Sequence, residues 1–500
     1  MAPVEEVALQ VAHLAQARQM CDSGDAAQRD EALRLAQRAK DVFRERGSPD
    51  QEAKAWLILA DLQLARRKFA AAASAAAASR ELCRRAGDAP GEAAALRKAA
   101  AAWTCAKDHH GALAASREAA QIFRRTGRRD EEASDLVAAA RSHAALGNHT
   151  AATTAAEAAL RMFEETGAGL AEEVGAVDVV VQVRLAAGAA GEARKVADAV
   201  LARCRAAGKP GPQAGALLLL TRVALAEGDF AGVLKMTQEA LRACQGADVR
   251  QVQAKVHLAQ AEAEQHKRHF QQAITAAEKA LAISEEAGDV DGQAAAMRRH
   301  AAVLFAQGGA AAGLRMAERE RLLFAGAGDT PGEAAALLAA FGLQAAAGNL
   351  RAALLLAEEA RGLLEEHGDA AGAADTRLRV AKAHLDASNF TEAIAAAEHA
   401  RRDFGGLARP GGEAEALLLV AEARLAQHRG QAAGEQDVPA LGDRASCAIK
   451  AAAEATRIAR KIGDRRLAAE TLRALAEAQV LAGGWSAAAR AADGAAALFE

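Results

Sequence analysis

Apolar residues recur at helical spacing along the chain, and short polar breaks interrupt them at regular intervals. Between residues 371 and 408 the apolar set is Val380, Ala381, Leu385, Phe390, Ala393, Ile394, Ala397 and Ala400. The set is interrupted at Ser388-Asn389, a polar pair typical of a turn. The segment therefore predicts two antiparallel helices of about 17 residues, each roughly 25 Å long.

This two-helix unit repeats about every forty residues. Glycines mark the end of successive units at Gly47, Gly87, Gly127, Gly167, Gly208, Gly288, Gly328 and Gly368. A second series, here called the half-repeat positions, follows the polar breaks at Phe69, His109, His149, Ala190, Phe230, Phe270, Ala310, Leu350 and Phe390. A fixed period of this size is typical of a solenoid, in which each unit buries its apolar face against its neighbours. We therefore expect an all-α fold.

Small residues occupy fixed places in each unit, where they would let helix axes approach closely. They lie three after the half-repeat position (Ala72, Ala112, Ala152, Ala193, Ala273, Ala353, Ala393), ten after it (Ala119, Ala159, Ala240, Ala280, Ala360, Ala400) and nine before it (Ala60, Ala100, Ala140, Ala261, Ala301, Ala381). The glycine of each unit is expected to close one helix, and a following Asp to cap the next. At the polar breaks we expect Gly or Asn to supply the left-handed C-cap.

A small residue in the first helix, an aromatic residue after the turn, and alanines three and ten later resemble the tetratricopeptide repeat (TPR). The turn sequences Gly228-Asp229-Phe230 and Ser388-Asn389-Phe390 are similar to the commonest turn sequence of that motif. The forty-residue period resembles the long-repeat subgroup, which includes LGN/Pins adaptors, rapsyn, kinesin light chains and MalT-like sensors. The family's helix-A Gly and Tyr and its closing Pro are mostly absent here. The repeats around Ala190 and Ala310 are degenerate, with Gly313 and Glu320 where alanine is expected.

The resemblance implies a right-handed α-solenoid of about twelve antiparallel helix pairs, a TPR superhelix that covers residues 1–500 as one domain. One spacing in the glycine series departs from the forty-residue period, because Gly368 and Gly463 are two repeats plus 15 residues apart. The excess predicts an inserted loop at 428–444 in the eleventh repeat, where insertions are tolerated. Most such loops are mobile connections, and docking through residues 438–441 is the alternative.

Composition adds little to this picture. The net charge is −3, with 62 basic and 65 acidic residues, so we expect neither a nucleic-acid nor a membrane partner. No apolar run approaches a membrane span, and a cytoplasmic protein is expected. Three of the six cysteines, Cys83, Cys204 and Cys244, take the repeat position that Phe123 holds elsewhere. We therefore interpret them as core residues rather than catalytic thiols.

Chemical motifs are sparse, so the sequence predicts neither an enzyme nor a cofactor. Phosphate-binding, nucleophile-elbow and zinc-protease patterns are absent from it. His266 and His269, with His257 upstream, are the nearest approach to a metal pattern. His269 falls at a turn, and no further ligand is indicated. We predict no metal site.

The resemblance places a binding groove on the first helix of each repeat, eight and twelve residues before the half-repeat position. Eight before it lie Asp61, Arg141, Gln182, Arg222, Glu262 and Lys382, and twelve before it lie Arg97, Arg298 and, after the insertion, Arg473. These nine are the candidate partner-binding residues. Arginine recurs, and its guanidinium suits bidentate recognition of carboxylates. Ordinary solvated helix residues are the alternative interpretation.

These features favour a non-enzymatic scaffold or adaptor that binds a peptide or helical segment of a partner protein, with acidic ligand side chains meeting the groove arginines. The alternatives are a regulatory sensor that binds a small molecule, as MalT-like proteins do, and a cargo adaptor of the kinesin-light-chain type. At the end of the chain, Ala487, Ala491, Ala495, Leu498 and Phe499 are expected to leave an apolar surface. That surface predicts a longer native protein, self-association through the C-terminal end, or fraying.

Overall fold

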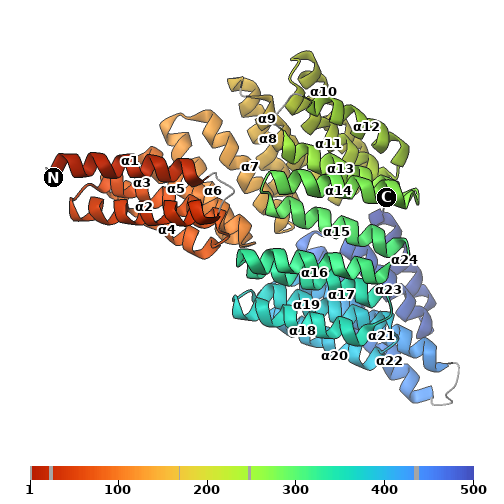
Figure 1. Cartoon of the computed structure of the whole chain (residues 1–500). Helices are drawn as coiled ribbons and strands as arrows, with labels where there is room; N and C mark the ends of the chain where they lie inside the picture. The colour runs from red at the N-terminus through yellow and green to blue at the C-terminus, as the bar shows by residue number, and fades with distance from the viewer. Residues whose placement is uncertain (1–2, 22–25, 168, 246–248, 433–437, 500) are drawn as a thin grey trace. The chain divides into compact units, whose positions relative to one another are not determined.

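The fold is all-α, as predicted. The computed structural model describes residues 3–21, 26–167, 169–245, 249–432 and 438–499, and in these ranges it has twenty-four helices and no strand (Figure 1). The chain divides into two compact units, Met1–Val303 with Gly326–Asp329, and Leu304–Ala325 with Thr330–Glu500. Each unit is a run of helix pairs.

The odd-numbered helices are the first helices of the repeats. Their bounds are α1 Pro3–Cys21, α3 Pro49–Ala65, α5 Ala89–Cys105, α7 Arg129–Ala145, α9 Leu170–Ala186, α11 Pro210–Glu227, α13 Arg250–His266, α15 Val290–Ala306, α17 Thr330–Ala346, α19 Ala370–Asp386, α21 Pro410–Ala432 and α23 Arg465–Leu481.

The even-numbered helices are the second helices, and from α4 to α20 each begins at a half-repeat position. Their bounds are α2 Ala26–Glu45, α4 Phe69–Ala86, α6 His109–Thr126, α8 His149–Thr166, α10 Ala190–Ala206, α12 Phe230–Cys244, α14 Phe270–Glu286, α16 Ala310–Ala327, α18 Leu350–Glu366, α20 Phe390–Gly406, α22 Val438–Ile462 and α24 Trp485–Phe499.

Left-handed residues end the helices where the sequence predicts them. All eight glycines of the forty-residue series have a positive φ, between 61° and 82°. The aspartate that follows often caps the next helix, since the Asp289 carboxylate accepts a hydrogen bond from the Gly292 N–H at 3.0 Å. The expectation for asparagine at the polar breaks is wrong. The left-handed residue is Ser388 in one break and Gly348 in another, while Asn389 and Asn349 have φ near −86° and −88°.

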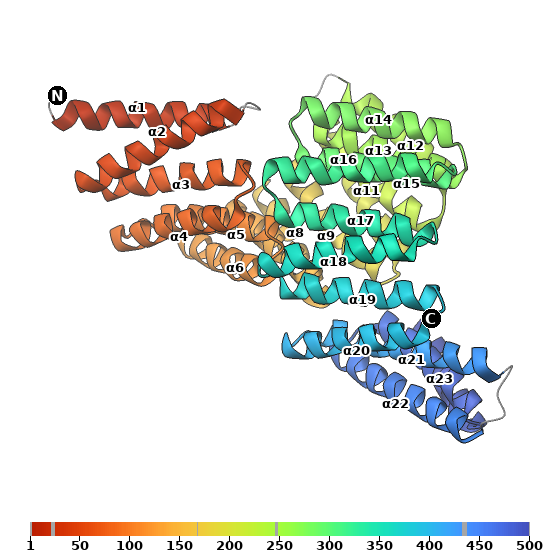
Figure 2. The same cartoon turned by 60° about the horizontal axis from the view of Figure 1, so that its bottom comes forward.

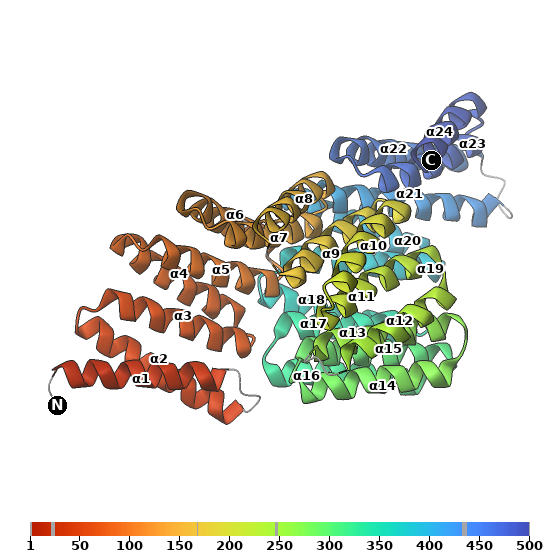
Figure 3. The same ribbon diagram turned by 90° about the horizontal axis from the view of Figure 1, so that it is seen from above.

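Packing produces two layers in each unit. Consecutive helices contact one another from α1 to α14 and from α17 to α24, and Figures 2 and 3 show α1 to α6 following in order. Odd-numbered helices also contact the next odd-numbered helix, from α1 through α13 in the first unit and from α19 through α23 in the second. Even-numbered helices make no comparable contact in the described parts of the chain. The odd-numbered helices therefore form a closer layer than the even-numbered ones.

Alanine fills the interior of both units, as the repeat pattern predicts. The alanines three and ten after the half-repeat positions are all buried, as are those nine before them. Larger groups occupy the end of the even-numbered helices, where Phe43, Phe163 and Phe404 are fully buried. Cys83, Cys204 and Cys244 are buried at the equivalent position, and burial raises the pKa of each thiol. This agrees with the structural interpretation of these cysteines.

The structure differs from the predicted 428–444 loop. Helix α21 continues to Ala432, and α22 already begins at Val438, so most of the excess residues lengthen two helices. Residues 433–437 lie outside the described residues. Arg429, Gln431 and Ala432 are good helix formers at the end of α21, and Pro439 lies in the first turn of α22, where its missing N–H costs no helical hydrogen bond.

The last helix buries part of the surface that the sequence leaves open. Ala491 and Ala495 of α24 are 7% exposed and pack against Leu472 of α23, whereas Trp485 is 70% exposed. Self-association through this end stays a prediction. Within the described ranges, no helix combines the length and the apolar character needed to cross a bilayer.

Candidate partner-binding face

The nine candidate residues lie on nine different odd-numbered helices, at two repeat positions that are four residues apart and therefore share one face of the helix. We call this surface of the odd-numbered layer the odd-helix face, and it is described separately for each unit. The first unit carries seven of them, on α3, α5, α7, α9, α11, α13 and α15, and the second carries Lys382 on α19 and Arg473 on α23. Arg141, Gln182, Arg298, Lys382 and Arg473 are exposed, and the other four are partly buried.

Ion pairs connect neighbouring odd-numbered helices across the face of the first unit. Asp61 Oδ1 of α3 lies 2.5 Å from Lys98 Nζ of α5, and Glu262 Oε2 of α13 lies 2.6 Å from Arg299 Nη2 of α15. Arg222 of α11 pairs with Asp178 of α9. Each pair joins two repeats, so these side chains contribute to the packing of the layer as well as to its surface.

Arg97 is the most enclosed of the candidate arginines. Its Nε donates to Asp135 Oδ1 of α7 at 2.6 Å, and its Nη2 donates to the Glu131 carbonyl at 2.6 Å. Its guanidinium also lies 4.7 Å from the centre of the Phe123 ring. The Asp135 side chain is only 5% exposed, and its Oδ2 accepts no hydrogen bond from the described residues. Burial therefore raises the pKa of Asp135 to about 6, although Arg97 opposes that rise.

Arg141 of α7 is the candidate arginine whose guanidinium is open, that is, exposed and without a partner among the described residues. It is exposed, and the described residues provide it with neither an ion pair nor a hydrogen bond. Gln182, the next candidate along the layer, is exposed as well. A guanidinium without an internal carboxylate keeps its donors available to a ligand.

In the second unit the face combines paired cations with carboxylates. Arg473 Nη2 of α23 lies 3.0 Å from Glu422 Oε1 of α21, and Arg429 pairs with Glu477. Burial raises the pKa of Glu422, while Arg473 and Lys382 lower it. Lys382 is exposed on α19.

Sequence reasoning missed the carboxylates that neutralise the candidate cations. Asp135, Asp178 and Glu422 occupy the neighbouring odd-numbered helix, 38, 44 and 51 residues from their partners. A search for opposite charges about one repeat apart would have indicated them, since that spacing places residues on adjacent helices of one layer.

The histidines near the α13–α14 turn have structural partners. The His266 ring stacks on Phe230, with ring centres 4.5 Å apart, and His269 Nδ1 lies 2.8 Å from Glu264 Oε2. In the part of the chain that the structure describes, no three His, Cys, Asp or Glu side chains are grouped so that they could hold a metal ion.

Comparison with known proteins gives a likeness in fold. No family model matches the chain, and no curated protein matches it. Yeast Tom70 is 12% identical over 90% of this chain and 92% of its own, with a TM-score of 0.47. A Rap protein complexed with competence and sporulation factor is 12% identical over 74% of this chain and 98% of its own, with a TM-score of 0.38.

A signal-transduction ATPase with a tetratricopeptide repeat sensor, from Pyrococcus horikoshii, is 15% identical over 69% of this chain, with a TM-score of 0.39. The match spans about half of that ATPase, 52% of its chain. At these identities the similarity is limited to the helical architecture and assigns no partner.

Proposed function

We propose that this protein is a non-enzymatic TPR-type scaffold that binds a segment of a partner protein along the odd-helix face of its first unit. The single observation that carries the proposal is the open guanidinium of Arg141, exposed on α7 between repeats whose candidate arginines are paired. A carboxylate of the partner segment would complete at Arg141 the pairing that Asp135 provides for Arg97.

The layered packing supports a face rather than a point as the binding site. Ion pairs hold α5 to α7 and α9 to α11, so the side chains around Arg141 and Gln182 are presented by a preorganised surface. Preorganisation lowers the entropic cost of ordering side chains on binding. Many weak contacts spread over several helices would then give useful affinity for an extended or helical segment.

Two of the cavities in the described residues are of a size that favours a protein segment over a small molecule at those places. They are shallow and measure about 230 and 250 Å³. Pockets that bury a drug-sized ligand usually measure ~300–1,000 Å³. A polymer that spreads over a surface has no need of such an enclosed site.

The experiment is an affinity capture from native lysate, quantified by mass spectrometry, with the Arg141→Glu variant beside the wild type. A carboxylate at position 141 would repel an acidic partner. We therefore expect Arg141→Glu to capture about tenfold less, or lower still, of each partner that the wild type retains. Raising the salt concentration should weaken the wild-type capture in the same direction.

Arg161→Glu on α8 is the matched control. Arg161 is exposed, has no ion pair among the described residues and lies on the even-numbered layer. The Arg161→Glu substitution makes the same charge change and should leave the captured amount of each partner unchanged. If Arg141→Glu retained the same partners as Arg161→Glu, the proposal for the odd-helix face would be wrong.

A further inference from the structure

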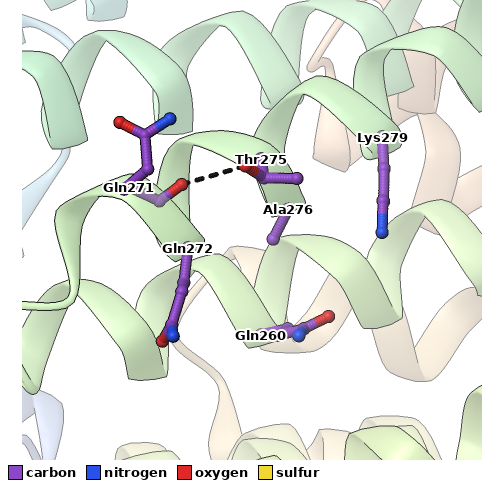
Figure 4. Close-up of a pocket in the computed structure, with 6 residues that line it drawn as sticks. All are labelled: Gln260, Gln271, Gln272, Thr275, Ala276 and Lys279. Carbon is purple, nitrogen blue, oxygen red and sulfur yellow. Dashed lines mark hydrogen bonds between the residues drawn. The ribbon is translucent and has the colours of Figure 1, made fainter.

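A second polar site lies on the opposite side of the layer, between α13 and α14 (Figure 4). Its cavity of about 230 Å³ is lined by Gln260, Gln271, Gln272, Thr275, Ala276 and Lys279. Gln260 is two residues from Glu262 of the odd-helix face, about 200° around the helix. The cavity is therefore distinct from the face proposed above.

The side chains that surround the cavity are uncharged amides and one ammonium. Figure 4 shows the ends of Gln260, Gln272 and Lys279 grouped around Ala276, while Gln271 points the other way and its carbonyl accepts from the Thr275 hydroxyl at 3.0 Å. The small Ala276 side chain leaves the hollow between them. None of the lining residues is acidic.

The hydrogen-bonding capacity of this group is largely unused. Gln260 Oε1 lies 3.3 Å from His257 Nδ1, which leaves the Gln260 amide N–H groups free to donate. Gln272 and Lys279 have no hydrogen bond or ion pair among the described residues. Burial lowers the pKa of His257 and the nearby Lys279 lowers it further, although the hydrogen bond with Gln260 opposes the change.

The equivalent site three repeats later provides an internal comparison. A cavity of about 250 Å³ there is lined by Val380, Ala396 and His399, each 120 residues after its counterpart. Its cations are already neutralised, because Arg361 pairs with Glu358 and Glu365, and Arg377 with Glu365 and Asp403. The cavity at α13–α14 differs in keeping an unpaired ammonium beside two amides.

We propose that the α13–α14 cavity binds an extended peptide segment through one acidic side chain. The peptide carboxylate accepts from Lys279 Nζ, and the neighbouring peptide groups bond to the amides of Gln260 and Gln272. A primary amide both donates and accepts, which matches the C=O and N–H of a peptide bond. The cavity is large enough for one side chain and its adjoining peptide groups, and too small for a drug-sized ligand.

The test uses phage-displayed random dodecapeptides selected on the full-length protein, with fluorescence anisotropy of the enriched peptides. We expect enriched sequences that contain Asp or Glu and bind Lys279→Ala at least about tenfold more weakly. Replacing that acid in the peptide by Asn or Gln should cause a similar loss. Alanine has high helix propensity, so helicity measured by circular dichroism should stay unchanged.

His399→Ala at the equivalent cavity is the matched control and should bind the enriched peptides like the wild type. Failure to enrich any peptide would overturn the proposal, and so would enriched peptides that bind Lys279→Ala with unchanged affinity. Peptides that lose affinity for Arg141→Glu alone would support the odd-helix face and reject the cavity, which keeps the two proposals separate.

Discussion

The turn inside each repeat requires one left-handed residue, two positions before the half-repeat marker. Gly147, Gly188, Gly228 and Gly348 fill it in some repeats, while Arg67, Lys107, Arg268 and Ser388 fill it in others, with φ between 56° and 61°. A side chain in this conformation costs about 1–2 kcal/mol, against about 0.5–1 kcal/mol for the extra chain entropy of glycine. The non-glycine turns are therefore local weak points of the fold.

Exchanging residues at these turns should shift stability in opposite directions. Lys107→Gly should raise the free energy of unfolding by about 0.5–1 kcal/mol, since it removes the strained conformation. Gly147→Lys should lower it by a similar amount, although nothing lies within 4 Å of an added Cβ. Urea unfolding followed by circular dichroism measures both. Equal midpoints for the two variants would contradict this interpretation of the turn.

The buried Asp135–Arg97 pair should make stability depend on pH. The folded-state pKa of Asp135 is raised from 3.8 to about 6, so between these values the folded protein binds more protons than the unfolded chain. The contribution of Asp135 to stability is then largest below pH 4 and is lost as pH rises through 6. The loss amounts to about 3 kcal/mol from a shift of roughly two units.

Asp135→Asn isolates this contribution, because asparagine keeps an acceptor for Arg97 and does not titrate. The stability of the wild type relative to Asp135→Asn should fall between pH 4 and pH 6 and stay constant above pH 7. Urea titrations at several pH values measure the difference. A difference independent of pH would mean that burial does not penalise the Asp135 carboxylate.

At the scale of the helices, glycine and alanine periodicity was enough to predict the elements. From α4 to α20 each even-numbered helix begins at a predicted half-repeat position, and the eight series glycines are left-handed. The same periodicity gave wrong predictions at one polar break and at the 428–444 insertion. Asn389 was expected to end a helix, but Ser388 takes the left-handed conformation and Asn389 is the N-cap of the next helix. The excess of 428–444 looked like a loop because length alone cannot separate an insertion between helices from an extension of them.

The sequence predicted which helices carry the candidate site residues, but not which of those residues have internal partners, and their role in binding stays a prediction. The sequence put Arg97, Arg141 and Arg222 on one face, and the structure places all three on odd-numbered helices. Which of them is open depends on carboxylates one repeat away, Asp135 and Asp178, and on burial that a single repeat does not reveal. The α13–α14 cavity was not predicted either, because it depends on Ala276 being small between two longer polar neighbours.

At the scale of the whole molecule, the two layers of each unit differ in spacing. Odd-numbered helices lie close to the next odd-numbered helix and are joined to it by ion pairs, and in the first unit Arg141 is the candidate arginine with an exposed guanidinium and no ion pair. Even-numbered helices are farther apart in the described chain, although ion pairs such as Arg80–Glu118 and Arg203–Glu164 also join them, and small polar cavities lie over the odd-numbered helices. A net charge of −3 gives no overall attraction for acidic partners, so recognition has to be local.

The central claim is that partners bind the odd-helix face of the first unit. Hydrogen–deuterium exchange of the protein alone and with a captured partner tests it most directly, because protection is read helix by helix. The account predicts slower exchange in peptides from α5, α7 and α9, with α6 and α8 unchanged. Protection confined to α6 and α8, or to α13 and α14, with α5, α7 and α9 unaffected, would contradict it.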